Sequence, residues 1–167
     1  LATGAVPRAL PQVADLENVQ VLRSADDAAA LRRAMQTAKT AVVIGGGYIG
    51  LEAAASFSKV GLNVHVVETA SRLLARVASP DMSAFFHDLH QRHGVMIHTG
   101  MTETKFHQKD GLFTGVTLDT GQEVLAELLL VGIGVAPEIA LADSIGAKTG
   151  NGIFVDCQMR TTIDDVY

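Results

Sequence analysis

Cysteine and tryptophan are nearly absent from this sequence of 167 residues, which has one cysteine and no tryptophan. A single cysteine can form neither an internal disulfide nor a Cys-x-x-Cys redox pair, so both are excluded within the chain. We expect Cys157 to be a free, buried thiol, because free cysteine usually behaves as a small hydrophobic residue. A free thiol fits a reducing compartment, and we therefore expect a cytoplasmic protein.

Long apolar runs and an excess of positive charge are also missing. Hydrophobic residues make up 48% of the chain, yet no run reaches the roughly 18 consecutive apolar residues that suggest a membrane-spanning helix. The formal net charge is -5 at pH 7, which argues against a basic surface for nucleic acid. The composition therefore predicts a globular domain with neither a membrane nor a nucleic-acid partner.

The two ends of the sequence suggest a piece of a longer protein. The chain starts without methionine, at Leu1-Ala2-Thr3-Gly4, a stretch typical of a strand entering a turn, and it stops at Val166-Tyr167. We divide it into an irregular linker over residues 1–18, a main domain over residues 19–150 and a return segment over residues 151–167.

Strand-like and helix-like segments alternate in the first part of the main domain. Apolar runs predict strands over residues 19–22, 40–44, 63–68, 95–98 and 128–131. Helices are expected after Ser24, over residues 49–60 and over residues 80–93. Ser24 and Asp27 have the spacing of a capping box, and Ser79-Pro80 is a typical helix start. This alternation predicts a parallel sheet.

The period changes after residue 100. Residues 102–108, 112–118 and 123–126 are strand-like and are joined by short turns that contain glycine, which predicts antiparallel pairing. A second glycine turn at residues 132–137, a short helix at 138–144 and a strand at 153–155 complete the pattern. The predicted fold class is therefore α/β, a Rossmann-like parallel sheet with helices on both faces and an inserted three-stranded antiparallel meander.

A glycine-rich turn follows the strand at residues 40–44. Gly45, Gly47 and Gly50 have the G-x-G-x-x-G spacing. In a strand-turn-helix unit the first glycine permits the tight turn, the second lets a pyrophosphate approach the backbone, and the third lets the helix pack on the strand. The amino end of the helix then faces the phosphates, which predicts a dinucleotide site.

An acidic residue, Glu68, ends the next predicted strand, eighteen residues after Gly50. A carboxylate at this place accepts hydrogen bonds from the adenosine ribose hydroxyls. It also favours NADH over NADPH, because it repels a 2′-phosphate. Arg72 and Arg76 argue against this preference, because either arginine could reach a 2′-phosphate. The alternative for each is an ordinary solvated arginine.

Taken together, these segments resemble the NAD-binding domain of the pyridine nucleotide–disulfide oxidoreductase superfamily, in its ferredoxin reductase branch. The resemblance covers essentially the whole chain and rests on residues 1–4, 42–52, 68–76, 132–137 and 151–156. In that family NADH passes a hydride to FAD, and FAD passes single electrons to an iron–sulfur protein of the ferredoxin or rubredoxin type. The linker and the return segment would then connect to an FAD domain.

The resemblance also implies roles for individual residues, with none assigned as catalytic and none as a metal ligand. Tyr48 would lie near the nicotinamide, Glu52 near its carboxamide and Arg76 near the adenosine. The full NAD(H) set comprises Gly45, Gly46, Gly47, Tyr48, Ile49, Gly50, Glu52, Glu68, Thr69, Arg76, Gly132, Ile133 and Gly134. The set expected to touch FAD in the full-length protein comprises Ala2, Thr3, Gly4 and Arg8.

The sequence departs from this family at several points. The glycine turn for the FAD pyrophosphate and the later Gly-Asp element on the flavin are not in these 167 residues, and Glu138 stands where asparagine is commoner. We therefore expect the isolated chain to bind NADH but to have no diaphorase activity. The alternatives are a regulatory nicotinamide-binding module, the NAD domain of a nitrite reductase or NADH oxidase, and a purely structural domain.

Overall fold

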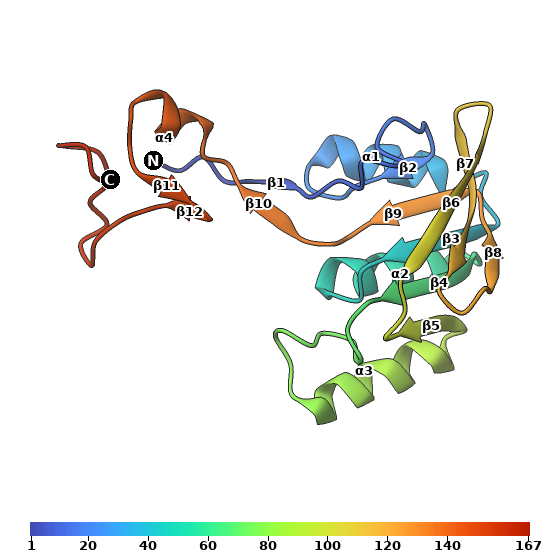
Figure 1. The fold of residues 1–167 in the computed structure, drawn as a ribbon. Coiled ribbons are helices and arrows are strands. Elements are labelled where there is room, and N and C mark those ends of the chain that lie inside the picture. Colours follow the sequence, from blue (N-terminus) through green and yellow to red (C-terminus); the bar gives the residue numbers. More distant parts are fainter. The chain divides into compact units, whose positions relative to one another are not determined.

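The computed structural model describes the backbone of residues 1–167 and every side chain except that of Thr104. The chain forms two compact units (Figure 1). The larger unit contains residues 9–134, and the smaller one combines residues 1–8 with residues 135–167. These boundaries differ from those expected from the sequence, because residues 9–18 belong to the larger unit, where Val13 is buried.

A five-stranded parallel sheet is the centre of the larger unit, with the order β2-β9-β3-β4-β5. All four neighbouring pairs are parallel. The strands are β2 (Val19–Gln20), β3 (Thr40–Ile44), β4 (Asn63–Glu68), β5 (Val95–Thr99) and β9 (Leu128–Val131). Every residue of β9 and all but the first of β3 are buried, as expected for strands covered on both faces. The predicted parallel sheet is confirmed.

Three helices connect these strands, namely α1 (Ala25–Ala34), α2 (Tyr48–Lys59) and α3 (Pro80–Arg92). The capping box at the start of α1 is present, with Ser24 and Asp27 each bonded to the other's backbone. The Ser79 hydroxyl accepts a hydrogen bond from the backbone N–H of Met82 at the start of α3. Both predicted helix starts are confirmed, because caps depend only on neighbouring residues.

The helices of the larger unit pack on one face of the parallel sheet, not on both as expected. Leu31 of α1, Phe57 of α2 and Phe86 of α3 all pack in the cluster that contains Val43 and Val66. The opposite face, which includes Val42 and Ile44, is covered by the antiparallel strands and by residues of the 9–18 segment. On that face the meander provides the apolar surface that helices would otherwise provide. The prediction of helices on both faces of the sheet is therefore wrong.

The meander itself forms as expected, from β6 (Glu103–Lys109), β7 (Leu112–Leu118) and β8 (Glu123–Leu125). Its pairings are antiparallel. Asp110 and Gly111 join β6 to β7 with φ of 53° and 79°, the left-handed values that a two-residue hairpin turn requires. The side chains of Phe113, Val116 and Leu118 on β7 are buried against the parallel sheet.

The smaller unit contains two short antiparallel sheets and a short helix. β1 (Ala5–Pro7) pairs with β10 (Val135–Pro137), and β11 (Thr149–Gly150) pairs with β12 (Gly152–Ile153). Residues 5–7 were expected in the irregular linker and residues 135–137 in the second glycine turn. Both segments form strands because each provides the other's hydrogen-bonding partner. The strand expected at residues 153–155 lies at β12 instead, and α4 (Ala140–Ser144) confirms the short helix.

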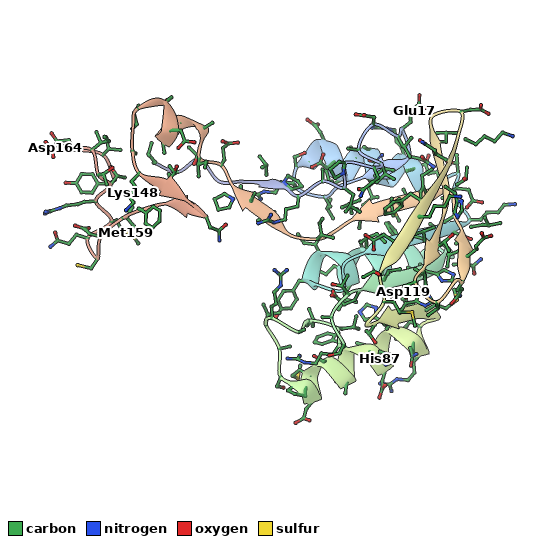
Figure 2. All side chains as sticks on the ribbon, in the orientation of Figure 1. Glu17, His87, Asp119, Lys148, Met159 and Asp164 are labelled. Atoms are coloured by element: carbon green, nitrogen blue, oxygen red, sulfur yellow. The ribbon has the colours of Figure 1, made fainter. Side chains whose placement is uncertain are left out.

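Two side chains of the smaller unit are informative. Cys157 is exposed, so the expectation of a buried thiol is wrong in this structure. Lys148, labelled in Figure 2, belongs to this unit. Its Nζ lies 5.0 Å from the ring centre of Phe154. Among the helices described, none has both the length and the apolar character needed to cross a membrane.

Candidate functional site

Strand register brings three of the predicted site residues to one edge of the parallel sheet. Ile44 is aligned with Val67 on one side and with Val131 on the other. The next residues, Gly45, Glu68 and Gly132, therefore stand in one row. Since ligands of open α/β sheets bind beyond the carboxyl ends of the strands, this row is the candidate site.

The two glycine turns at this edge are in direct backbone contact. Gly45 has φ of +109°, and a Cβ there would lie 2.4 Å from the carbonyl oxygen of Gly132. A Cβ on Gly50 would lie 2.0 Å from the carbonyl oxygen of Gly45. Both distances are far shorter than a van der Waals contact, so only glycine fits. The predicted roles of Gly45 in the turn and of Gly50 in helix–strand packing are confirmed.

Gly47 differs from these two glycines because the space beside it is open. Of the described atoms, none lies within 4 Å of the point that a Cβ on Gly47 would occupy. Gly47 is the N-cap of α2, and in the part of the chain described no side chain accepts a hydrogen bond from this helix end. The first N–H groups of a helix lack partners within the helix, so this end can bind an anion.

Glu68 is held against the first glycine turn. Its Oε2 accepts a hydrogen bond from the N–H of Gly46 at 2.7 Å, and its Oε1 accepts one from the N–H of Ala70 at 2.8 Å. The carbonyl of Gly46 accepts a hydrogen bond from the N–H of Leu74 at 2.9 Å. The carboxylate is therefore fixed at the end of β4 and half-buried, and the N–H of Gly46 is directed to Glu68.

The two arginines of the loop after β4 have different environments. Arg76 is exposed, and its Nη2 lies 3.7 Å from the point that a Cβ on Gly134 would occupy, so it lies beside the second glycine turn. Arg72 is partly buried and donates hydrogen bonds to the carbonyls of Ala75 and Ala78 and to the hydroxyl of Ser83. Neither interpretation offered for Arg72, phosphate ligand or solvated side chain, matches this arrangement.

The remaining residues of the predicted NAD(H) set lie around the same edge. Tyr48, Ile49 and Glu52 are exposed near the start of α2. Tyr48 and Glu52 are four residues apart and therefore lie on one side of the helix. Thr69, which follows Glu68, is exposed, and Ile133 of the second glycine turn is half-buried. All thirteen residues of this set belong to the larger unit.

The residues expected to touch FAD lie in the smaller unit. Gly4 has φ of 74°, and its carbonyl accepts a hydrogen bond from the N–H of Glu138 at 3.0 Å. The hydroxyl of Thr3 donates to the carbonyl of Glu138. Ala2 and Arg8 are exposed. The structure therefore places the NAD(H) set and the FAD set in different units.

Some notable groups near the sheet carry no short motif and were missed from the sequence. Leu74 is a buried non-glycine residue with φ of 52°. His65 Nδ1 and His98 Nε2 lie 3.0 Å apart on neighbouring strands, with stacked rings. Burial lowers the pKa of both imidazoles, and for His65 the neighbouring His98 lowers the pKa further. The sequence could have indicated this pair only through the alternation of side chains along each strand, which places both rings on one face of the sheet.

Three histidines recur every three residues at the end of α3, namely His87, His90 and His93. His90 is buried, and burial is the main reason why its pKa is lowered. His93 is the C-cap of α3, and its Nδ1 lies 2.8 Å from the carbonyl of Leu89. Within the described residues, no group of three or more His, Cys, Asp or Glu side chains is arranged to hold a metal ion.

Comparison with known proteins identifies the family. The whole chain, residues 1–167, matches the family model described as pyridine nucleotide-disulphide oxidoreductase. The chain belongs to this family. The match covers both the larger unit with its glycine turns and the smaller unit.

Individual relatives agree with this assignment. Rhodocoxin reductase of Rhodococcus erythropolis is 42% identical over 167 residues, which cover 99% of this chain and 39% of the relative. Putidaredoxin reductase of Pseudomonas putida is 39% identical over 168 residues, covering 97% of this chain and 40% of the relative. The crystal structure of the ferredoxin reductase for the CYP199A2 system of Rhodopseudomonas palustris has a TM-score of 0.92 and 43% identity, covering 97% of this chain and 40% of that one. The chain thus spans about two fifths of these relatives' length.

Proposed function

We propose that this chain binds NADH at the carboxyl edge of its parallel sheet, as the NADH-binding part of an FAD-dependent reductase that passes electrons to a ferredoxin-type iron–sulfur protein. One observation carries the proposal. The open helix end at Gly47 lies beside a carboxylate, Glu68, that hydrogen bonds hold at the end of β4. These are the two features that bind the pyrophosphate and the adenosine ribose of a dinucleotide.

The residues present fit NADH part by part. The N–H groups at the start of α2 would hold the pyrophosphate, since an uncapped helix end favours an anion. Glu68 would accept hydrogen bonds from the adenosine ribose, and Arg76 would lie near the adenosine. Tyr48 and Glu52 would line the nicotinamide end together with the second glycine turn. The bound cofactor supplies the hydride, and these residues bind and orient it.

The choice of NADH over NADPH rests on the same carboxylate. A 2′-phosphate would face the negative charge of Glu68. Arg72, one of the two arginines near enough in sequence to offset this charge, instead donates hydrogen bonds to two carbonyls and a hydroxyl. This supports a preference for NADH.

The electron acceptor is proposed from the relatives. Two of them are named as reductases of rhodocoxin and putidaredoxin, and the third as a ferredoxin reductase. Since this chain spans about two fifths of their length, FAD and the iron–sulfur partner belong to the proposal for the whole protein. Hydride transfer requires two cofactors held face to face, so we expect the 167-residue chain alone to bind NADH without diaphorase activity. A cytoplasmic location stays a prediction.

Calorimetry with the 167-residue chain tests the binding proposal. We expect tighter binding of NADH than of NADPH. Glu68→Gln should weaken NADH binding roughly tenfold, because a hydrogen bond to a charged group contributes about 1.5–3 kcal/mol, and it should narrow the difference between the two cofactors. Glu123→Gln, a change of an exposed carboxylate on β8, is the matched control and should have no effect.

Three results would each contradict a part of the proposal. The absence of heat with millimolar NADH would remove the binding function. Tighter binding of NADPH than of NADH by the unmodified chain would leave a dinucleotide site but would refute the role given to Glu68. Robust FAD-dependent NADH oxidation by the same chain would contradict the expected lack of diaphorase activity.

A further inference from the structure

We propose that Arg72 is a positioning residue for the cofactor site, which holds the loop after β4 so that Arg76 lies beside the second glycine turn. This inference rests on the proposed NADH-binding function. It assigns Arg72 no contact with the cofactor. Its effect on binding is transmitted through the loop and through Arg76.

The hydrogen bonds of Arg72 carry the first step of the argument. Nη1 donates to the carbonyl of Ala78 at 2.9 Å and to the hydroxyl of Ser83 at 2.6 Å, while Nη2 donates to the carbonyl of Ala75 at 2.9 Å. A guanidinium is planar and rigid, so three bonds in different directions fix the loop backbone around it. A lysine ammonium retains the charge but lacks this geometry.

Ser83 connects this loop to α3. It is one of the few buried polar side chains, with 3% of its surface exposed. Its hydroxyl accepts from Arg72 and donates to the carbonyl of Leu73 at 2.6 Å. Ser83, in the first turn of α3, is thereby bonded both to the guanidinium of Arg72 and to the carbonyl of Leu73. These two bonds restrict the conformations open to the loop.

The loop is also tied to the first glycine turn. Leu74 adopts the left-handed conformation, with φ of 52°, and its N–H donates to the carbonyl of Gly46. A Cβ on Gly46 would lie 2.6 Å from Cδ2 of Leu73, which is buried. The left-handed conformation is unfavourable for a residue with a side chain, so surrounding contacts must maintain it. The hydrogen bond from Arg72 to the carbonyl of Ala75, which spans Leu74, is such a contact.

Arg76 is placed by this arrangement. It follows Ala75, whose carbonyl is bonded to Arg72, and it precedes Val77, whose N–H donates to the carbonyl of Leu74. The Arg76 side chain is exposed and reaches the second glycine turn at Gly134. A binding group fixed in advance loses less conformational entropy when a ligand binds, so a loosened loop should weaken NADH binding.

A double-mutant cycle separates positioning from general damage to the fold. In the 167-residue chain, Arg72→Lys should weaken NADH binding roughly tenfold by calorimetry, the size expected for a loss of charged hydrogen bonds. In an Arg76→Ala background the same change should weaken binding less than about twofold, because the group that it positions is gone. Arg33→Lys, on the exposed surface of α1, is the matched control and should change nothing.

Ser83→Ala provides a second arm, which replaces the first if Arg72→Lys fails to fold. It removes the bond from Arg72 and the bond to the carbonyl of Leu73 without changing any charge, and its effect on NADH binding should likewise disappear in the Arg76→Ala background. Equal effects in both backgrounds would overturn the inference in favour of a general structural role. Full NADH affinity in Arg72→Lys would overturn it too, since charge alone would then suffice. Failure of the unmodified chain to bind NADH would instead refute the proposed function.

Discussion

Replacing Gly47 with alanine separates cofactor binding from stability, because the structure gives this glycine open space. Its φ of −83° and ψ of −176° are extended values that alanine adopts without strain. Alanine is a poorer N-cap than glycine, but it restricts the unfolded chain more, and these opposing effects leave a net change within about 0.5 kcal/mol. We therefore expect Gly47→Ala to fold with nearly unchanged free energy of unfolding.

The cost of Gly47→Ala should appear in NADH binding. A methyl group at this point occupies the space through which a pyrophosphate approaches the start of α2. Displacement by this methyl group would lose or lengthen about two charge-assisted hydrogen bonds, each contributing roughly 1.5–3 kcal/mol. The expected result is a dissociation constant for NADH at least about a hundredfold larger.

Gly50→Ala is the matched comparison, since the same methyl group meets backbone instead of open space. Its Cβ would lie 2.0 Å from the carbonyl oxygen of Gly45 and 3.2 Å from Cγ1 of Val43. Overpacking against groups that can move costs typically 1–3 kcal/mol. Here the obstacle is the backbone of a turn that itself contacts Gly132, so we expect a loss of about 3 kcal/mol or more.

Urea denaturation and calorimetry on both variants give the decisive comparison. A folded Gly47→Ala variant that binds NADH as tightly as the unmodified chain would refute the placement of the pyrophosphate. A Gly50→Ala variant as stable as Gly47→Ala would refute the close-packing argument. Circular dichroism spectra in the far ultraviolet check that each variant retains its helices and strands before binding is measured.

Two further predictions concern stability. Burial lowers the pKa of His65, His90 and His98 below the value of 6.5, so the unfolded chain binds protons more readily than the folded one. The free energy of unfolding should therefore fall as the pH drops from about 7.5 to about 5.5. His98→Gln should make this fall smaller. Equal free energies of unfolding at the two pH values would contradict the argument. At the β6–β7 turn, Gly111→Ala forces alanine to φ of 79° and should lower the free energy of unfolding by roughly 1–2 kcal/mol with NADH affinity unchanged. A variant as stable as the unmodified chain in urea would show that the turn readily adopts another conformation.

The sequence by itself determined the local features and the chemistry of the glycine turn. Helix caps at Ser24 and Ser79, the hairpin turn at Asp110-Gly111 and the alternation of strands and helices along the chain followed from residues close together in the sequence. The spacing of Gly45, Gly47 and Gly50 with Glu68 predicted one site because backbone conformation and strand alternation are local properties.

Only the tertiary structure decided what depends on residues far apart in the chain. Residues 5–7 form a strand because residues 135–137 pair with them, and no pattern near residue 5 encodes that partner. The helices cover one sheet face because the meander, itself correctly predicted, packs on the other. The sequence predicts that Arg72 is either a solvated arginine or a phosphate ligand. In the structure its guanidinium instead donates a hydrogen bond to the hydroxyl of Ser83, eleven residues away. The physical reason is common to all three: pairing and packing partners far apart in the chain are decided when the elements come together, which sequence periodicity does not specify.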